Sequence, residues 1–200
     1  MRILCITVIA AGLAAGMCTA RADNLIANPN FSGDVAGWTA DTGSTISYDA
    51  NLDANASGTS GSMAVSRTSV DTFNLSAHQC FSVAGGSDFS FGAKVIPGIA
   101  NSVGMTCSAF ASLDCTGKPL GNASAIIAGS PDPNGWVPLR TESPYLLPAP
   151  TQSVACAVTG NLSPPLRAGS PQGGPSSMWA DNVFFGAGTT PVSLQGFDID

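Results

Sequence analysis

Charged residues are scarce in this 200-residue chain, since Asp, Glu, Lys and Arg make up only 10% of it and there is one Glu and one His. Helix surfaces are normally built from Glu, Lys, Arg and Gln, so this scarcity argues against a helix-rich fold. The seven basic residues form no run and are outnumbered by 13 acidic ones. We therefore expect no nucleic-acid partner. The 44% apolar content is enough to fill a core and argues against wholesale disorder.

Long apolar runs are absent except at the N-terminus, where Ile3 to Met17 follows the positive charge of Arg2 and precedes the small-x-small triplet Ala20-Arg21-Ala22. This pattern predicts a signal peptide over residues 1–22 and a secreted or periplasmic protein. No later run is long enough for a transmembrane helix. Removal of these 22 residues leaves 178, enough for one domain, with 13 acidic residues against five basic ones and a net charge of −8.

Outside the signal peptide the chain has only four cysteines, an even number that favours two disulfides in an exported protein. Cys107 and Cys115 are close in sequence, so a bridge across a bent hairpin is the expected first pair, which leaves Cys80 with Cys156. In that second pair Cys80 alternates out of phase with its apolar neighbours while Cys156 is in phase. One of the two must then lie at a strand end or bulge, or the pairing is different.

Short segments with alternating apolar residues recur between clusters of Gly, Pro, Asn and Asp, and no segment beyond the signal peptide shows a helical period. The clearest strands are 89–95, 103–109, 154–158 and 179–185. We count about nine strands, which predicts an all-β fold, a single antiparallel jelly-roll sandwich of two sheets. It should span residues 23–186, with a C-terminal tail over 187–200 that adds an edge strand or docks on the sandwich.

Two segments are loops by composition, Asp49 to Ser62 and Ser163 to Ser177. The first contains Asp49, Asn51 and Asp53, which place three oxygen side chains at alternate positions, as in a calcium-binding loop. It is not an EF-hand, because the glycine and the terminal glutamate of that loop are missing. The alternatives are a loop that binds a structural calcium and a polar loop that contacts only solvent.

Several short motifs resemble family 4/9 carbohydrate-binding modules, the sandwiches attached to many bacterial cellulases and xylanases. The opening Asn24 to Phe31, the later Gly135-Trp136 and the closing Ala180-Asp181-Asn182-Val183 carry the resemblance. It covers roughly Asp23 to Gly186 and implies the same β-sandwich. It also implies a structural calcium held partly by Asp181, although Ser32 stands where the family has a carboxylate.

The resemblance implies a sugar-binding surface, which usually needs exposed aromatic rings and flanking polar groups. Trp38 and Trp136 occupy positions that resemble buried structural tryptophans of the family. The candidate ligand-binding residues are therefore aromatic side chains next to loops, namely Tyr48, Phe73, Tyr145 and Trp179.

Catalytic motifs are absent from the sequence. Glu142 and the 12 Asp residues single out no carboxylate pair of the kind a glycosidase needs, and no nucleophile elbow accompanies His78. We therefore expect a non-catalytic exported sandwich that binds a polysaccharide or cell-surface glycan. The alternatives are a structural or protein-interaction module of the cell surface or matrix that has lost sugar binding, and, third, a small polysaccharide-degrading enzyme. The sequence does not indicate an oligomeric state.

Overall fold

The computed structural model describes residues 23–69, 73–98, 100–128, 135–162 and 177–188, which form 11 strands and contain no helix. The strands are β1 Thr39–Ala40, β2 Ser44–Asp49, β3 Ser62–Arg67, β4 Asn74–Ser82, β5 Asp88–Ile96, β6 Ser102–Phe110, β7 Gly121–Ala128, β8 Val137–Arg140, β9 Tyr145–Leu146, β10 Ser153–Asn161 and β11 Ser177–Ala187. This confirms the predicted all-β class. The count exceeds the expected nine partly because β1 and β9 have only two residues each.

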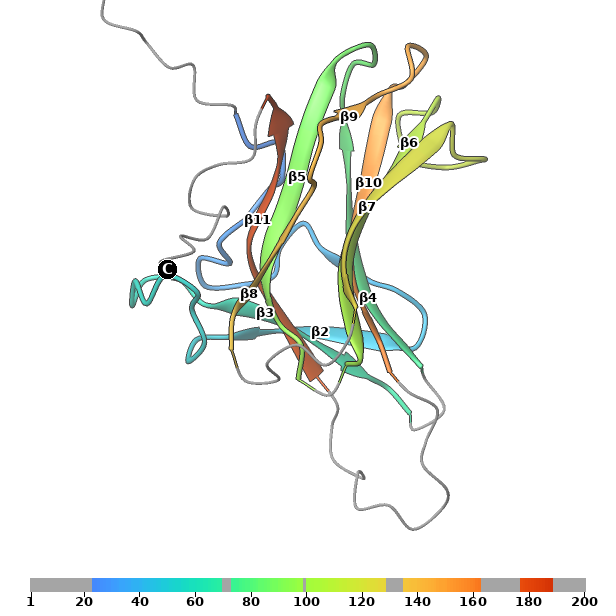
Figure 1. Ribbon diagram of the computed structural model, residues 1–200. Helices are drawn as coiled ribbons and strands as arrows, with labels where there is room; N and C mark the ends of the chain where they lie inside the picture. Colours follow the sequence, from blue (N-terminus) through green and yellow to red (C-terminus); the bar gives the residue numbers. More distant parts are fainter. Residues whose placement is uncertain (1–22, 70–72, 99, 129–134, 163–176, 189–200) are drawn as a thin grey trace, which may run out of the picture.

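Two antiparallel sheets face each other and form a sandwich (Figure 1). The five-stranded sheet has the order β1-β4-β10-β6-β7, and the six-stranded sheet has the order β2-β3-β11-β5-β8, with β9 also paired to β5. Strands β7 and β8 therefore form the edges of the two sheets on the same side of the sandwich. This placement creates the cleft described below.

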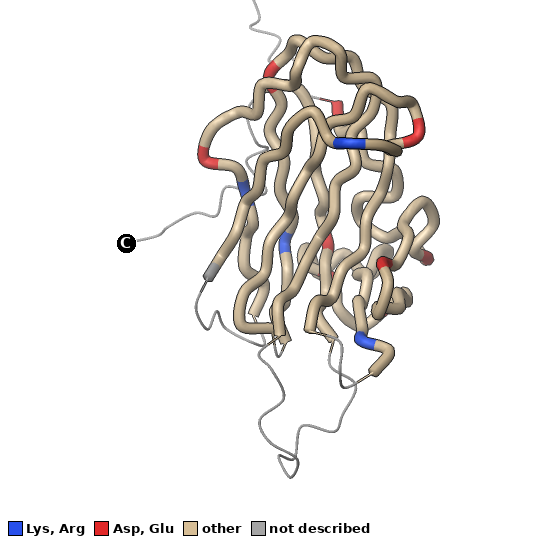
Figure 2. Tube along the Cα trace, turned by 90° about the vertical axis from the view of Figure 1, so that its right-hand side faces the viewer, with Lys and Arg blue, Asp and Glu red and all other residues tan. Residues whose placement is uncertain are grey.

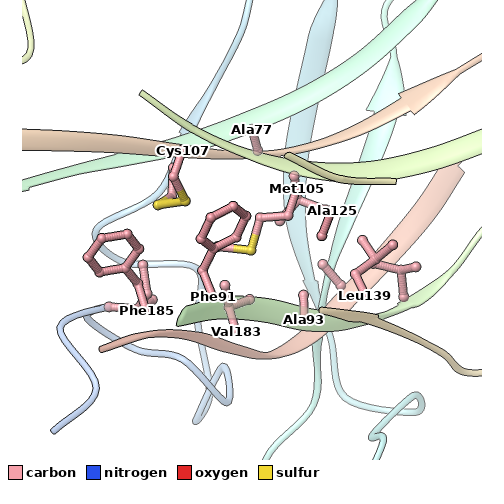
Figure 3. Packing of buried hydrophobic residues seen from close by; sticks show 14 of the residues in the cluster. Ala77, Phe91, Ala93, Met105, Cys107, Ala125, Leu139, Val183 and Phe185 are labelled. Carbon is pink, nitrogen blue, oxygen red and sulfur yellow. A yellow bond between two sulfur atoms is a disulfide. The ribbon is translucent and has the colours of Figure 1, made fainter. Parts of the chain in front are cut away.

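The core lies between the sheets, where alternate side chains of each strand point inward. Phe89 and Phe91 of β5 stack against Phe185 of β11, with ring centroids 5.0 and 6.2 Å apart. The facing sheet supplies smaller and more flexible groups, including Met105 and Ala125 (Figure 3). Large rings on one sheet against small side chains on the other let the layers interdigitate.

The disulfides differ from the predicted pairing of Cys107 with Cys115 and of Cys80 with Cys156, which is wrong. The structure pairs Cys107 with Cys156 and Cys80 with Cys115. Strand β10 lies beside β6, so Cys156 is directly opposite Cys107 and both point into the core. Cys80 faces outward from β4, on the opposite side of the sheet from Cys156, and instead bridges to the loop that joins β6 and β7.

The predicted signal peptide, the loop segment 163–176 and most of the predicted tail, from residue 189 on, lie outside the described residues. The described part of the tail continues β11 through Ala187. The described segments contain no helix that could span a membrane.

Candidate functional site

A cleft of about 540 Å³ opens between the edge strand β7 and the segment that runs from β8 to β9. Its volume lies within the range usual for small-molecule sites, roughly 300–1,000 Å³. Eleven residues line it, contributed by two stretches of chain: Ala123, Ser124, Ala125, Ile126, Arg140, Thr141, Glu142, Ser143, Pro144, Tyr145 and Leu146. The site thus exists only because the edges of the two sheets lie side by side.

The residues that line the cleft include one cation, one carboxylate and several hydroxyl groups. Arg140 and Glu142 are both exposed, and neither forms an ion pair with another described residue. Ile126 is 65% exposed and lies opposite Gly104 on the outer face of the five-stranded sheet. Leu146 is 62% exposed and lies opposite Asp88 on the outer face of the six-stranded sheet. A glycosidase needs two carboxyl groups on either side of the bond that it cleaves, and Glu142 is the only carboxylate among the lining residues. This chemistry suits binding better than hydrolysis.

Tyr145 is the single aromatic residue of the cleft and is half-buried. Its hydroxyl is enclosed by the protein and has no hydrogen-bond partner among the described residues. A side chain at Gly121 of β7 would come within 3.1 Å of this hydroxyl. The same burial raises the pKa of Tyr145 above its usual value. Tyr145 therefore lines the cleft, although its hydroxyl is enclosed by the protein.

The structure does not bring the four predicted aromatic residues together. Tyr48 is half-buried in β2 and packs against the core. Trp179 lies in β11, and its Nε1 donates a hydrogen bond to Oδ2 of Asp49 over 3.1 Å. Phe73, just before β4, is 42% exposed. Only Tyr145 therefore belongs to the cleft.

The two tryptophans predicted to be structural differ in burial. Trp38 is 6% exposed and lies 5.8 Å from the ring of Phe31, as expected of a core residue. Trp136 is only half-buried.

Of the predicted calcium ligands, Asp49 ends β2, Asn51 and Asp53 lie in the loop that follows it, and Asp181 lies in β11. Asp181 is fully buried, and its carboxylate accepts hydrogen bonds from the backbone N–H groups of Ala54 (2.9 Å) and Asn182 (2.7 Å). Burial raises the pKa of Asp181 to about 6, and the nearby negative charge of Asp53 adds to this shift. The described residues contain no group of three or more His, Cys, Asp or Glu arranged to hold a metal ion.

Asn182 positions this loop through a bulge in β11. The register of β11 with β5 shifts between Asp181 and Phe184, and Asn182 has a φ of 49°. Asparagine tolerates this left-handed conformation better than most residues. Its side-chain amide exchanges two hydrogen bonds with that of Asn55, at 2.8 and 3.1 Å. The bulge therefore ties the 50–61 loop to the last strand.

A second polar cluster lies at the β1–β4 edge of the five-stranded sheet. Nδ1 of His78 is 2.7 Å from Oδ1 of Asp41, and the Ser76 hydroxyl donates a hydrogen bond to the other oxygen of the same carboxylate. In a hydrolytic triad the hydroxyl would be bonded to the imidazole. Here the serine and the histidine share the aspartate, so the cluster lacks an activated nucleophile.

The strands of the five-stranded sheet contribute no formally charged side chain to its outer face. None of its five strands contains Asp, Glu, Lys or Arg, and Figure 2 views the molecule from this side. Most outward positions of β4, β10, β6 and β7 hold serine, threonine, alanine, glycine or asparagine, and the others include His78, Cys80 and the 65%-exposed Ile126. The one aromatic residue in phase with them, Phe110, lies at the end of β6 and is 8% exposed. This face offers hydroxyl groups but no aromatic platform.

A scan against protein-family models and a search of curated proteins each found no match. Solved structures do match. The xylan-binding domain of Paenibacillus barcinonensis Xyn10C, a family 22 carbohydrate-binding module, aligns with a TM-score of 0.54 at 13% identity, over 80% of this chain and 98% of that one. A family 4 module aligns with a TM-score of 0.51 at 11% identity, over 82% and 99%.

The enzymatically active domain of bacteriophage CBA120 tailspike protein 4 also matches, with a TM-score of 0.59 at 15% identity. The match covers 82% of this chain but only 21% of the tailspike chain, so the two share one sandwich and not the whole enzyme. Three structures that are matched over nearly their full length are carbohydrate-binding modules. This chain thus has the fold of carbohydrate-binding modules, which confirms the resemblance at the level of fold.

Sequence reasoning missed most of the cleft, because its lining comes from two stretches that meet only in the folded sandwich. The best available signal was the pair Ile126-Ile127. Successive residues of a strand point to opposite faces, so one of two adjacent isoleucines must face away from the core. The structure shows that Ile126 is that residue.

Proposed function

We propose that this protein is an exported, non-catalytic module that binds a glycan in the cleft between β7 and β8–β9. The observation that carries the proposal is a cleft of about 540 Å³ that contains the predicted ligand residue Tyr145. The fold shared with carbohydrate-binding modules supports it. Two disulfides support an oxidising compartment, secreted or periplasmic.

Binding would rest on a mixture of contacts. The exposed part of the Tyr145 ring buries the C–H surface of a sugar. Arg140 donates hydrogen bonds to hydroxyl oxygens, and Glu142 accepts them from hydroxyl groups. A sugar hydroxyl can donate one hydrogen bond and accept another. Arg140 and Glu142 can therefore bind adjacent hydroxyls of one sugar ring.

A glycan array probed with the mature protein tests this function. We expect at least one glycan to bind, and Tyr145→Ala or Arg140→Ala to weaken its binding by about tenfold, which corresponds to ~1.4 kcal/mol. Leu113→Ala is the matched control, because Leu113 is 67% exposed but lies outside the cleft. No binding to any glycan would overturn the proposal.

The three other predicted ligand residues, Tyr48, Phe73 and Trp179, are tested in the same array. None of the three lines the cleft. Each therefore remains a predicted sugar contact at a different surface. Loss of binding in Phe73→Ala or Trp179→Ala, with Tyr145→Ala unaffected, would contradict a site in the cleft.

A module for protein interaction or structure is the second candidate, and one observation favours it. The outer face of the five-stranded sheet lacks both charge and exposed aromatic rings in the described residues. Such a face is a poor sugar platform. The array separates the two candidates, because an interaction module predicts that no glycan binds.

Structural calcium is a separate proposal, whose predicted ligands are Asp181, Asp49, Asn51 and Asp53. Calcium prefers six to eight oxygen ligands, so backbone and amide oxygens of the 50–61 loop would have to complete the set. The burial of Asp181 beside a second carboxylate supports the proposal, because a cation would offset their repulsion. We expect calcium to raise the melting temperature relative to protein in a chelator, and no shift would overturn this idea.

A further inference from the structure

Two of the three tryptophans lie on the outer face of the six-stranded sheet. Trp179 of β11 is opposite Ile96 of β5, and Val95, the neighbour of Ile96, packs in the core. Successive residues of a strand point to opposite faces, so Ile96 and Trp179 both point outward. On the other side of β5, Val137 of β8 is opposite Val95 and also packs against the core. Trp136 immediately precedes Val137 and therefore points outward, level with Ile96.

The burial of neighbouring residues on this face fits two rings that cover them. Ile96 points outward between the two tryptophans, yet it is only 5% exposed. Ala64 of β3, which is opposite Trp179 on its other side, also points outward and is 8% exposed. Trp136 and Trp179 are half-buried, so each keeps part of its ring in contact with solvent. The face therefore presents two partly exposed rings beside buried aliphatic side chains.

Trp179 is fixed in place on this face. Its Nε1 donates a hydrogen bond to Oδ2 of Asp49 at the end of β2. On the opposite side, a side chain at Gly98, just after β5, would come within 3.5 Å of Cζ3 of the indole. The indole therefore lies along the sheet between these two contacts. Because its N–H group is already bonded, a ligand would meet the face of the ring, and little side-chain entropy would be lost on binding.

The two tryptophans are separated by one strand, because β5 lies between β11 and β8. Neighbouring strands are about 4.8 Å apart, which places level positions on β11 and β8 roughly 9–10 Å apart. An extended disaccharide has about this length. A sugar chain that crosses the strands can therefore stack one ring on Trp179 and the next ring but one on Trp136.

We propose that this face is a second sugar-binding surface, at which Trp136 and Trp179 bind the chains of an insoluble, neutral β-1,4-linked glucan. The inference rests on the proposed glycan-binding function and adds a surface to the cleft. In β-1,4-linked glucose the hydroxyl groups are equatorial, so the faces of each ring carry C–H groups that bury well against indole. Two rings on the face of a sheet contact an extended chain from one side only, which suits chains displayed on a solid.

Other polysaccharides match this face less well. The neighbouring row of outward residues contains two carboxylates, Asp49 and Asp181, and one ammonium group, that of Lys94. A uronate would bring further negative charge to this row. An α-1,4-linked glucan coils, so its rings cannot stay level with both tryptophans. A neutral, extended chain has neither disadvantage.

Depletion binding to microcrystalline cellulose tests the inference with the mature protein. We expect the protein to bind cellulose, and Trp136→Ala and Trp179→Ala each to weaken this binding about tenfold through the loss of one stacked ring. Leu113→Ala is the matched control and should bind normally, because Leu113 is 67% exposed but lies in the loop between β6 and β7. Unchanged binding in both tryptophan variants would overturn the inference, and so would equally tight binding to starch granules.

Trp179→Phe separates stacking from folding, because Trp179 is also hydrogen-bonded to Asp49. Phenylalanine keeps an aromatic ring but loses this hydrogen bond. We expect the phenylalanine variant to bind cellulose more tightly than Trp179→Ala and less tightly than the unchanged protein. A phenylalanine variant that binds no better than the alanine variant, at an unchanged melting temperature, would contradict stacking on this ring.

Hydroxyl-radical footprinting of the protein bound to cellulose gives a second readout. Trp38, which is 6% exposed, serves as the unreactive reference, and Phe73, which is 42% exposed, as the reactive one. Oxidation of Trp136 and Trp179, measured by mass spectrometry, should be largely lost on cellulose while Phe73 stays reactive. Protection of Phe73 or Tyr145 in place of the two tryptophans would show that another surface binds the polysaccharide.

The outcomes separate this surface from the cleft. Cellulose binding that is lost in Tyr145→Ala but not in the tryptophan variants would overturn the second surface and leave the cleft standing. Array glycans bound through Tyr145, together with no binding to cellulose, would lead to the same conclusion. Binding to no glycan, soluble or insoluble, would overturn both proposals.

Discussion

At the residue scale, Asp181 and Tyr145 are buried polar groups whose burial gives a direct test. Asp181 is fully buried, and burial raises its pKa to about 6. The hydroxyl of Tyr145 is enclosed without a partner.

The pH dependence of stability tests Asp181. A carboxyl whose folded-state pKa is raised contributes stability that is fully present below its unfolded value of 3.8 and is lost as the pH rises through about 6. We expect the free energy of unfolding to fall between pH 4 and pH 7 by on the order of 2–3 kcal/mol from this group. Urea unfolding with a chelator present measures it.

The Asp181→Asn side chain cannot ionise, so the variant should lose this pH dependence of the unfolding free energy. An unchanged pH dependence would contradict the assignment.

Below pH 4 the free energy of unfolding should instead fall with falling pH, because of Asp53. Burial acts to raise the pKa of Asp53, but hydrogen bonds from Ser57 and Ser60 outweigh it and lower this pKa to about 2. Stability from Asp53 is present above 3.8 and is lost as the pH falls towards 2.

Tyr145→Phe separates the hydroxyl from the ring. Removing a buried hydroxyl that has no partner should stabilise the fold by about 1 kcal/mol, since its desolvation is not repaid by a hydrogen bond. Thermal melting measures this change. Glycan binding should survive in Tyr145→Phe and be lost in Tyr145→Ala. A marked loss of stability in the phenylalanine variant would show that the hydroxyl has a partner.

At the element scale, alternation predicted the strands well but not how they pair. The predicted segments 89–95, 103–109, 154–158 and 179–185 all fall within β5, β6, β10 and β11. The two-residue alternation of a strand shows which of its residues share a face, but not which strands are neighbours in the sheet. Strand β10 lies between β4 and β6, far from both in sequence, and this placement decides the disulfides. The out-of-phase position of Cys80 was the sequence signal against its pairing with Cys156.

The two disulfides should differ in their response to reductant. Cys107 and Cys156 are fully buried in the core, whereas Cys80 is exposed. Thiolate attack requires access to a sulfur. Under mild reduction of the folded protein, we expect alkylation and mass spectrometry to find Cys80 and Cys115 modified first. Cys107 and Cys156 should react only on unfolding, and simultaneous reaction of all four would contradict the structure.

At the scale of the whole molecule, the sandwich class followed from composition and alternation, and the solved structures match it. The position of the cleft could not be predicted from composition and alternation. Its two halves, residues 123–126 and 140–146, meet because β7 and β8 are the edges of opposite sheets. Tyr145 was found from its residue type alone, while Arg140 and Ile126 needed the topology. Fold class is therefore readable from local pattern here, and the cleft is a property of sheet order.

The most direct test of glycan binding in this cleft is an NMR titration of the mature, nitrogen-15-labelled protein with the glycan that binds best. The account predicts that the perturbed amides cluster in residues 121–126 and 140–146, and that the glycan spectrum does not change with time, since no bond is cleaved. Perturbations centred instead on the outer face around His78, Thr106 and Ala157, or steady breakdown of the glycan, would contradict it.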